Sequence, residues 1–80
     1  MASVAKVDKV VDAKGQMCPM PILTLKRAFK ELAIGQVVAI SATDQGANRD
    51  IPTWCEATGN TLLQVTEERG VLTFYIQRTV

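Results

Sequence analysis

Apolar residues recur along the chain with two different spacings, and each spacing predicts a different element. Four segments are rich in β-branched residues or alternate between apolar and polar positions, which predicts strands over residues 7–12, 37–43, 61–68 and 71–78. Apolar positions three and four residues apart predict a first helix over residues 19–33, with one face formed by Ile22, Leu25, Phe29 and Leu32. A second, shorter helix is predicted over residues 51–58.

The order strand, helix, strand, helix, strand, strand predicts the fold class. We expect an α/β (α+β) two-layer sandwich, in which a mixed four-stranded sheet carries both helices on one face. Residues 37–43 are apolar on both sides, which suits an inner strand. Arg69-Gly70 is expected to join the last two strands as a hairpin. The length is enough for one core, so a single domain is expected over residues 1–80.

Capping residues predict where the two helices begin and end. Gly35 is expected to stop the first helix. Asp50 is expected to cap the start of the second helix, with Pro52 in its first turn and Gly59 after its end. One face of this helix is apolar, which predicts burial of Trp54 and Cys55 and an inward position for Ile51, Trp54, Cys55 and Thr58.

The segment Gly15-Gln16-Met17-Cys18-Pro19-Met20-Pro21 stands directly before the first helix. Glycine permits a sharp turn there, and proline is tolerated in a first helical turn because the N–H that it lacks would have no partner. Cys18 is therefore expected at or beside the helix N-terminus, where unpaired N–H groups and the helix dipole stabilise a thiolate. A lone cysteine is most often buried, but the two prolines and the exposed flanking positions favour a reactive thiol.

The Gly15-x-x-Cys18-Pro19-x-Pro21 pattern resembles the TusA/SirA-type sulfur-carrier proteins. The resemblance extends over nearly the whole chain, including Arg49-Asp50-Ile51-Pro52 and Gly59-Asn60-x-Leu62-Leu63. It implies the same fold, and a persulfide formed on Cys18 whose sulfur is relayed for transfer RNA thiolation, molybdenum cofactor synthesis or sulfur oxidation. Gly15, Pro19 and Pro21 would then position the backbone. Met20 departs from the family's tRNA-linked branch, where an acidic residue is common, which leaves the identity of the partners open.

A docking surface for partner proteins is expected beside Cys18. On the helical wheel, Met20, Leu23 and Arg27 form a stripe away from the core face, with Lys26 and Lys30 at its rim. Exposed Met and Leu side chains next to a nucleophile indicate contact with a partner. Asp44 and Arg49, from the loop before the second helix, are candidates for the opposite side of this surface. Arg49 fits a solvated charge and an anion-holding group near Cys18 equally well.

Composition argues against several classes of function. The net charge of +1 and the aromatic content of 5% leave little to attract or stack nucleic acid. No apolar run is long enough to cross a bilayer, and the N-terminus lacks the apolar centre of a secretory signal. Two distant cysteines and the absence of histidine predict neither a disulfide framework nor a metal site, and no cofactor is expected. A cytoplasmic protein without a membrane partner fits these features.

Three classes of function follow from these observations. The first is a stoichiometric sulfur carrier, for which the resemblance implies a donor protein (a cysteine desulfurase or a rhodanese-like protein) and an acceptor protein. The second is a small RNA- or protein-binding regulatory module without thiol chemistry. The third is a redox protein that pairs Cys18 with Cys55, which the inward position of Cys55 disfavours.

Overall fold

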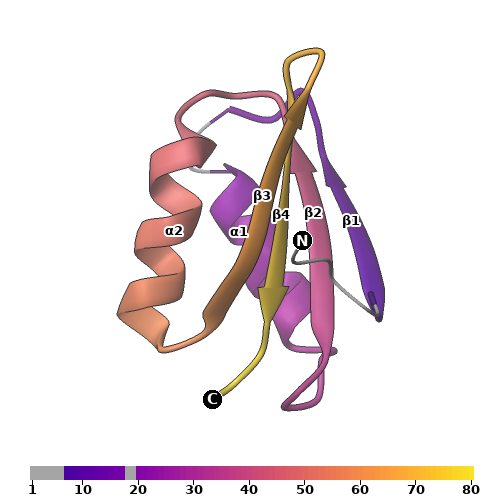
Figure 1. The fold of residues 1–80 in the computed structure, drawn as a ribbon, viewed down its shortest axis with the longest axis vertical. Helices are drawn as coiled ribbons and strands as arrows, with labels where there is room; N and C mark the ends of the chain where they lie inside the picture. The colour runs from indigo at the N-terminus through magenta and orange to yellow at the C-terminus, as the bar shows by residue number, and fades with distance from the viewer. Residues whose placement is uncertain (1–6, 18–19) are drawn as a thin grey trace.

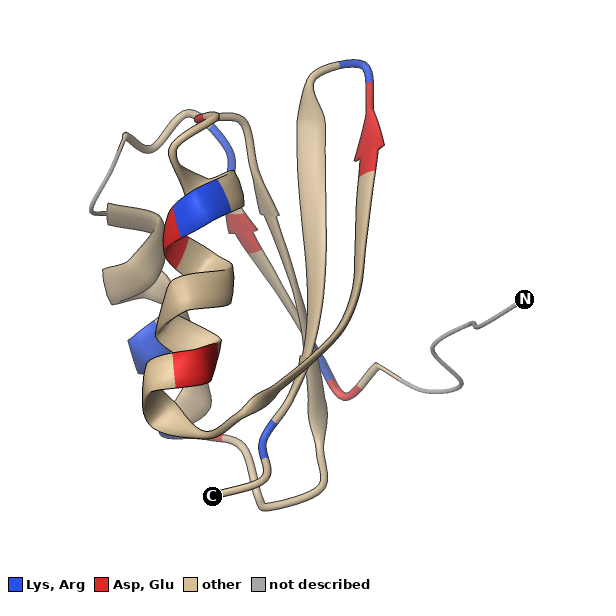
Figure 2. Ribbon diagram, turned by 60° about the vertical axis from the view of Figure 1, so that its left-hand side comes forward, with Lys and Arg blue, Asp and Glu red and all other residues tan. Residues whose placement is uncertain are grey.

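The computed structural model describes residues 7–17 and 20–80, which form a four-stranded sheet and two helices. Along the chain the elements are β1 (Lys9–Ala13), α1 (Met20–Phe29), β2 (Val37–Ala42), α2 (Ala47–Thr58), β3 (Thr61–Glu68) and β4 (Val71–Gln77). Both helices lie on the same face of the sheet, and the other face is open (Figure 1, Figure 2). The predicted two-layer α+β sandwich is therefore confirmed.

The sheet is mixed, with the strand order β1-β2-β4-β3. β1 pairs with β2 in parallel, whereas β4 is antiparallel to both β2 and β3. β2 therefore has a partner on each side, as its two-sided apolar pattern predicted. Because β1 and β2 are parallel, their carboxyl ends lie at one edge of the sheet, and the loops that lead into α1 and α2 both start there.

The core lies between the sheet and the two helices. Alternate residues of β2 and β4 supply its inner sheet layer: Val38, Ile40, Ala42, Leu72, Phe74 and Ile76. The helices cover this layer with Leu25 and Phe29 from α1 and with Ile51 and Cys55 from α2. The rings of Phe29 and Trp54 meet edge to face, with centroids 4.9 Å apart, so Trp54 is half-buried against the core as predicted.

α1 ends at Phe29, so the predicted end at residue 33 is wrong. Beyond Phe29 the backbone tightens, and the next three N–H groups each bond to the carbonyl three residues earlier. The Arg78 guanidinium donates to the carbonyl oxygens of Phe29 and Leu32. Leu32 is still buried, so its apolar spacing indicated the correct side of the chain although the α-helix ends before it. Gly35, with φ +95°, lies after this turn and does not stop the helix.

α2 begins at Ala47, earlier than the predicted start at residue 51. Gly46 occupies the N-cap position, and no side chain caps the helix, so Asp50 lies in the first turn and is not the cap. Pro52 consequently lies inside the helix. The earlier start buries Ala47 on the same helical stripe as Ile51 and Cys55. The Asp-Ile-Pro sequence looks like a helix start, but burial of Ala47 extends the helix toward the N-terminus.

The C-terminal end of α2 follows the prediction with one exception. Gly59 has φ +84°, and the N–H groups of Gly59 and Asn60 both donate to the carbonyl oxygen of Cys55, which ends the helix. Thr58, however, is exposed, so its predicted inward position is wrong. Its hydroxyl donates to the carbonyl oxygen of Trp54, one helical turn earlier, at 2.8 Å.

The strands lie where the sequence predicted them: both ends of β3 match the prediction, and the ends of the other strands differ by at most two residues. β1 begins at Lys9 and extends to Ala13, and β2 ends before Thr43. β4 ends at Gln77, and the backbone of Arg78 bonds to Gly35 and Gln36 before β2 while its side chain reaches the carbonyl oxygens after α1. The hairpin between β3 and β4 is confirmed: Arg69 and Gly70 have φ +54° and +80°, as a two-residue turn with two left-handed positions requires.

Candidate functional site at the carboxyl edge of β1 and β2

The loop of residues 14–17 connects β1 to the segment before α1 and is fixed by backbone hydrogen bonds. Gly15 has φ +82°, a left-handed conformation that favours glycine. Its N–H donates to the hydroxyl oxygen of Thr43, which follows β2, at 2.9 Å. The N–H of Gln16 donates to the carbonyl oxygen of Ala13 at 3.2 Å. The predicted turn at Gly15 is therefore present, and it is joined to the loop that follows β2.

A second side-chain bond joins this loop to α1. The hydroxyl of Thr24 donates to the side-chain oxygen of Gln16 at 2.8 Å. The N–H of Met20 donates to the carbonyl oxygen of Met17 at 2.8 Å. Cys18 and Pro19 lie outside the described residues. The described residues on both sides of them, Met17 and Met20, are the last described residue before this gap and the first residue of α1. Figure 1 shows the loop after β1 and the start of α1 near the end of the sheet where β1 and β2 end.

The start of α1 separates buried from exposed apolar side chains. Pro21 and Leu25 are buried, whereas Met20 is 42% exposed and Leu23 is 41% exposed. Met17, in the preceding loop, is 74% exposed. We call Met17, Met20 and Leu23 the apolar patch. The helical phase predicted for α1 is confirmed, since Met20 and Leu23 lie away from the core face.

Basic side chains continue the exposed face of α1 beyond the apolar patch. Lys26, Arg27 and Lys30 are exposed, and no described residue forms an ion pair with them. The helix itself, residues 20–29, contains no acidic residue. The exposed face of α1 therefore carries apolar groups at its start and positive charges in and just after its last turn, where they can attract an acidic partner surface.

Asp44 and Arg49 lie at the same edge, around the start of α2. Asp44 is half-buried, and its carbonyl oxygen accepts the N–H of Ala47 in the turn that begins the helix. Arg49 is exposed, and its Nε lies 3.5 Å from a carboxylate oxygen of Asp50. No contact between these residues and the apolar patch is described, so their predicted part in a docking surface stays a prediction.

Comparison with known proteins bears on this geometry. The sequence matches the family described as Sulfurtransferase TusA over residues 9–78. The chain belongs to the TusA family. It is 48% identical over 73 residues to YrkI of Bacillus subtilis, whose name marks it as a candidate sulfur carrier, and the match covers 91% of this chain and 97% of YrkI. It is 37% identical to the sulfur carrier protein TusA of Allochromatium vinosum, covering 94% and 99% of the two chains.

A solved structure shares the fold of this TusA-family chain. It is the crystal structure of a SirA-like protein from Desulfitobacterium hafniense, which is 26% identical. The TM-score is 0.78, and the match covers 90% of this chain and 99% of the other. The predicted resemblance to this family is thus confirmed by the family match, and the shared fold agrees with it.

Four residues at this edge of the TusA-family chain were not identified from the sequence: Gln16, Met17, Thr24 and Thr43. The hydrogen bonds of Thr43 and Gly15 join residues 28 positions apart, which no local pattern reveals. The strand order could have indicated this bond. If the first two strands are parallel, the loops that follow them lie at the same edge of the sheet, so Thr43 could be expected near the loop that contains Gly15. Met17 could have been predicted as part of the docking surface with Met20 and Leu23, since it is the immediate neighbour of Cys18 in the sequence.

Cys55 is a free thiol in the core of this TusA-family chain. Burial raises the pKa of its thiol to about 11, because the protein interior disfavours the thiolate. A thiol that is buried and protonated near neutral pH is a poor nucleophile and a poor partner for disulfide exchange. The predicted inward position of Cys55 is confirmed, and it argues against a redox pair that uses this residue.

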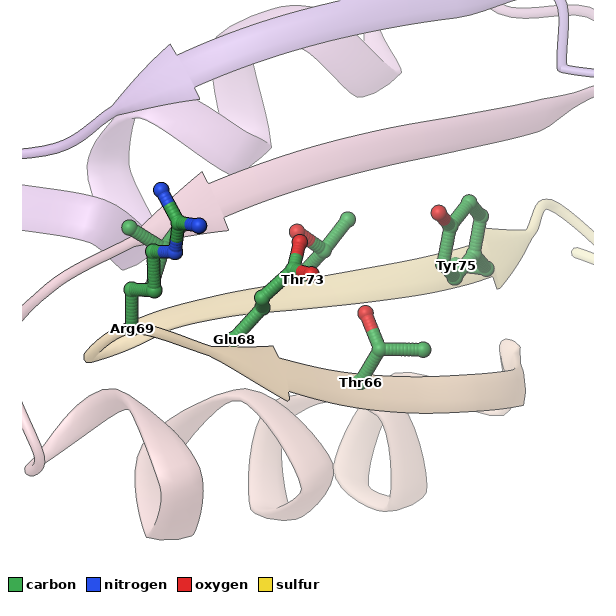
Figure 3. A pocket seen from close by; sticks show the side chains of 6 residues that line it. Thr66, Glu68, Arg69, Thr73 and Tyr75 are labelled. Carbon is green, nitrogen blue, oxygen red and sulfur yellow. The ribbon is translucent and has the colours of Figure 1, made fainter.

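The open face of the sheet offers a different kind of surface. A hollow of about 600 Å³ lies over β3 and β4 there, and Figure 3 shows Thr66, Thr73 and Tyr75 projecting into it. The other aromatic rings, Phe29, Trp54 and Phe74, belong to the core or pack against it. A nucleic-acid platform needs several aromatic or basic groups, and Figure 2 shows basic and acidic residues interspersed. This face of the TusA-family chain therefore gives little support to RNA binding.

Among residues 7–17 and 20–80, no three side chains of the metal-binding types gather into a group. Within the same ranges, no helix is long and apolar enough to cross a membrane.

The raised pKa of Cys55 predicts a pH-dependent stability. An unfolded cysteine titrates near pH 8.5, roughly, whereas the pKa of folded Cys55 is about 11. Between these values the unfolded chain loses a proton that the folded chain keeps, so stability falls as pH rises. In a Cys18→Ser background, we expect the free energy of unfolding in urea to fall by up to about 1.4 kcal/mol per pH unit more steeply than in the same protein carrying Cys55→Ala. Equal slopes for the two proteins would contradict the assigned burial of the thiol.

Proposed function

We propose that this protein is a sulfur carrier that accepts sulfane sulfur as a persulfide on Cys18 and relays it to an acceptor protein. The observation that carries the proposal is the position of the residues on either side of Cys18. Met17 and Met20 lie at the edge where two loops are joined by the Gly15–Thr43 hydrogen bond, and both side chains are exposed. Membership of the TusA family, with relatives named as sulfur carriers, supports the same conclusion.

Activation of the Cys18 thiol must come from its surroundings, because the sequence contains no histidine to act as a base. α1 begins at Met20, two positions after Cys18 in the sequence, and the first turn of the helix as described contains no acidic side chain. Unpaired N–H groups and the positive end of the helix dipole would favour the thiolate, so its pKa is expected below the free value of about 8.5. Gly15, Pro19 and Pro21 would hold the backbone in the required direction.

The proposed chemistry is a pair of thiol exchange steps with no net oxidation. The Cys18 thiolate attacks the terminal sulfur of a donor persulfide, forming a new S–S bond on Cys18 while the donor's S–S bond breaks. The donor cysteine leaves as a thiolate, and the proton stays on the transferred sulfur. An acceptor nucleophile then attacks that terminal sulfur, and Cys18 leaves as the thiolate from which it began. Each carrier thus transfers one sulfur per visit and acts stoichiometrically.

Both partners must bring a reacting atom to the same thiol, so their visits exclude each other. Met20 and Leu23 would supply most of the contact energy, and the exposed Arg27 would steer acidic partner surfaces and select among them. A cysteine desulfurase or rhodanese-like donor in a reducing cytoplasm fits this chemistry. The relay would serve transfer RNA thiolation, molybdenum cofactor synthesis or sulfur oxidation, with residues 1–80 acting as one carrier domain.

Sulfur loading tests the function itself. After incubation with a cysteine desulfurase and cysteine, the intact mass of the wild-type protein should increase by one sulfur atom. Cys18→Ser should gain none, because it lacks the accepting thiol. Cys55→Ser should load like wild type, since Cys55 is buried away from the donor. An unchanged wild-type mass would favour a binding module, a loss of two hydrogens would favour a redox pair, and loading of Cys18→Ser would reverse the roles of the two cysteines.

Substitution of the apolar patch tests where partners dock. Leu23→Asp should slow sulfur transfer by about tenfold or more, because a charge in the centre of an interface removes a principal contact. The melting temperature should stay close to wild type, since Leu23 lies off the core face. Leu63→Asp is the matched control. Leu63 has nearly the same exposed fraction as Leu23 (40% against 41%), but it lies in β3 and not in α1.

The basic rim should respond differently to substitution. Arg27→Glu should slow transfer more at low than at high ionic strength, because salt screens the steering of an exposed charge. If Leu63→Asp slowed transfer as much as Leu23→Asp, or if Arg27→Glu had the same effect at every salt concentration, the docking surface would lie elsewhere.

A further inference from the structure

Two threonine hydroxyls tie the loop of residues 14–17 to its neighbours. Thr43, after β2, accepts the N–H of Gly15 at 2.9 Å. Thr24, in the second turn of α1, donates to the side-chain oxygen of Gln16 at 2.8 Å. One hydroxyl therefore anchors the loop to the segment that follows β2, and the other anchors it to α1.

We infer that Thr43 and Thr24 are positioning residues for the Cys18 thiol. The inference rests on the proposed function and deepens it, because it names the groups that set the direction in which the chain reaches Cys18. Neither threonine touches a reacting atom in the proposed steps. Each acts through the loop, Thr43 through the backbone of Gly15 and Thr24 through the side chain of Gln16.

The bond between Thr43 and Gly15 contributes little to stability, because both residues are exposed. If the hydroxyl were removed, water could satisfy the Gly15 N–H, so little folding free energy would be lost. Gly15 has no side chain, and a Cβ at this position would meet no atom within 4 Å, so packing does not fix the loop here. The backbone at Gly15 is therefore held by hydrogen bonds: the Gln16 N–H bonds back to Ala13 at the end of β1, and the Gly15 N–H bonds across to Thr43, after β2.

The bond between Thr24 and Gln16 acts from the opposite side. Both residues are half-buried, and they join the loop to the helix whose N-terminus would stabilise the thiolate. In the proposed function, a shift of the loop relative to α1 would change the distance and direction between the Cys18 sulfur and the N–H groups at the start of the helix. Transfer between two sulfur atoms requires close alignment, so a displacement of about 1 Å can lower a rate by up to about 100-fold.

Pairs of isosteric and conservative substitutions separate positioning from structure. Thr43→Val and Thr24→Val keep the side-chain shape and remove the hydroxyl, whereas Thr43→Ser and Thr24→Ser keep it. Two quantities are to be measured for each variant. The first is the pH midpoint of Cys18 alkylation in a Cys55→Ala background without any donor, and the second is the sulfur-transfer rate constant with a desulfurase. Thr66→Val, on the open face of the sheet, is the matched control.

We expect each Val variant to raise the alkylation midpoint by about half a pH unit and to slow transfer about threefold to tenfold, while the melting temperature stays near wild type. The Ser variants should restore both values, and Thr66→Val should change neither. Val variants indistinguishable from Thr66→Val, or Ser variants as impaired as the Val variants, would overturn the inference.

The two readouts also distinguish this inference from the proposed function. If wild type took up no sulfur while the Val variants still shifted the alkylation midpoint, the carrier function would fail and the positioning role would stand. If wild type loaded normally and the midpoint stayed constant in all variants, the positioning role would fail and the carrier function would stand.

Discussion

The parallel pairing of β1 with β2 determines where the proposed transfer site lies. It brings the carboxyl ends of the two strands to one edge, and each of the two loops leaving that edge leads into a helix. The bond from Gly15 to Thr43 joins these loops, so the segment before Cys18 is held by the sheet that forms the core. Without the parallel pairing, the loop of residues 14–17 and the start of α2 would not lie together.

One helix serves stability and surface chemistry at the same time. α1 buries Leu25 and Phe29 against the sheet and exposes Met20 and Leu23 to solvent. This division leaves Met20 and Leu23 accessible at little cost to the core. Cys55 shows the contrasting environment for a thiol: it is buried in the centre of α2, and its pKa is raised to about 11, so it contributes packing and stays protonated.

Sequence periodicity predicted the fold, the phase of α1, the hairpin at Arg69-Gly70 and the burial of Cys55, because each depends on residues close together in the chain. Helix ends were predicted less well. α1 ends early where Arg78, far along the chain, takes up its last carbonyl oxygens, and α2 starts early because Ala47 is buried. The hydrogen bonds that join Thr43 and Thr24 to the loop of residues 14–17 depend on how the elements pack in the fold, so the local sequence pattern did not predict them. The cysteine segment itself was recognisable from its glycine and prolines.

If sulfur enters and leaves through the carboxyl edge of β1 and β2, a donor must cover that edge when it binds. Backbone amide NMR spectra recorded while a cysteine desulfurase is added to the carrier measure this directly. The largest changes should fall on residues 14–17, Met20, Leu23 and residues 43–49, while Gly35 and Asn60, at the opposite end of the fold, stay unchanged. Changes centred on Gly35 and Asn60, or on Thr66 and Tyr75 of the open sheet face, would contradict a transfer site at this edge.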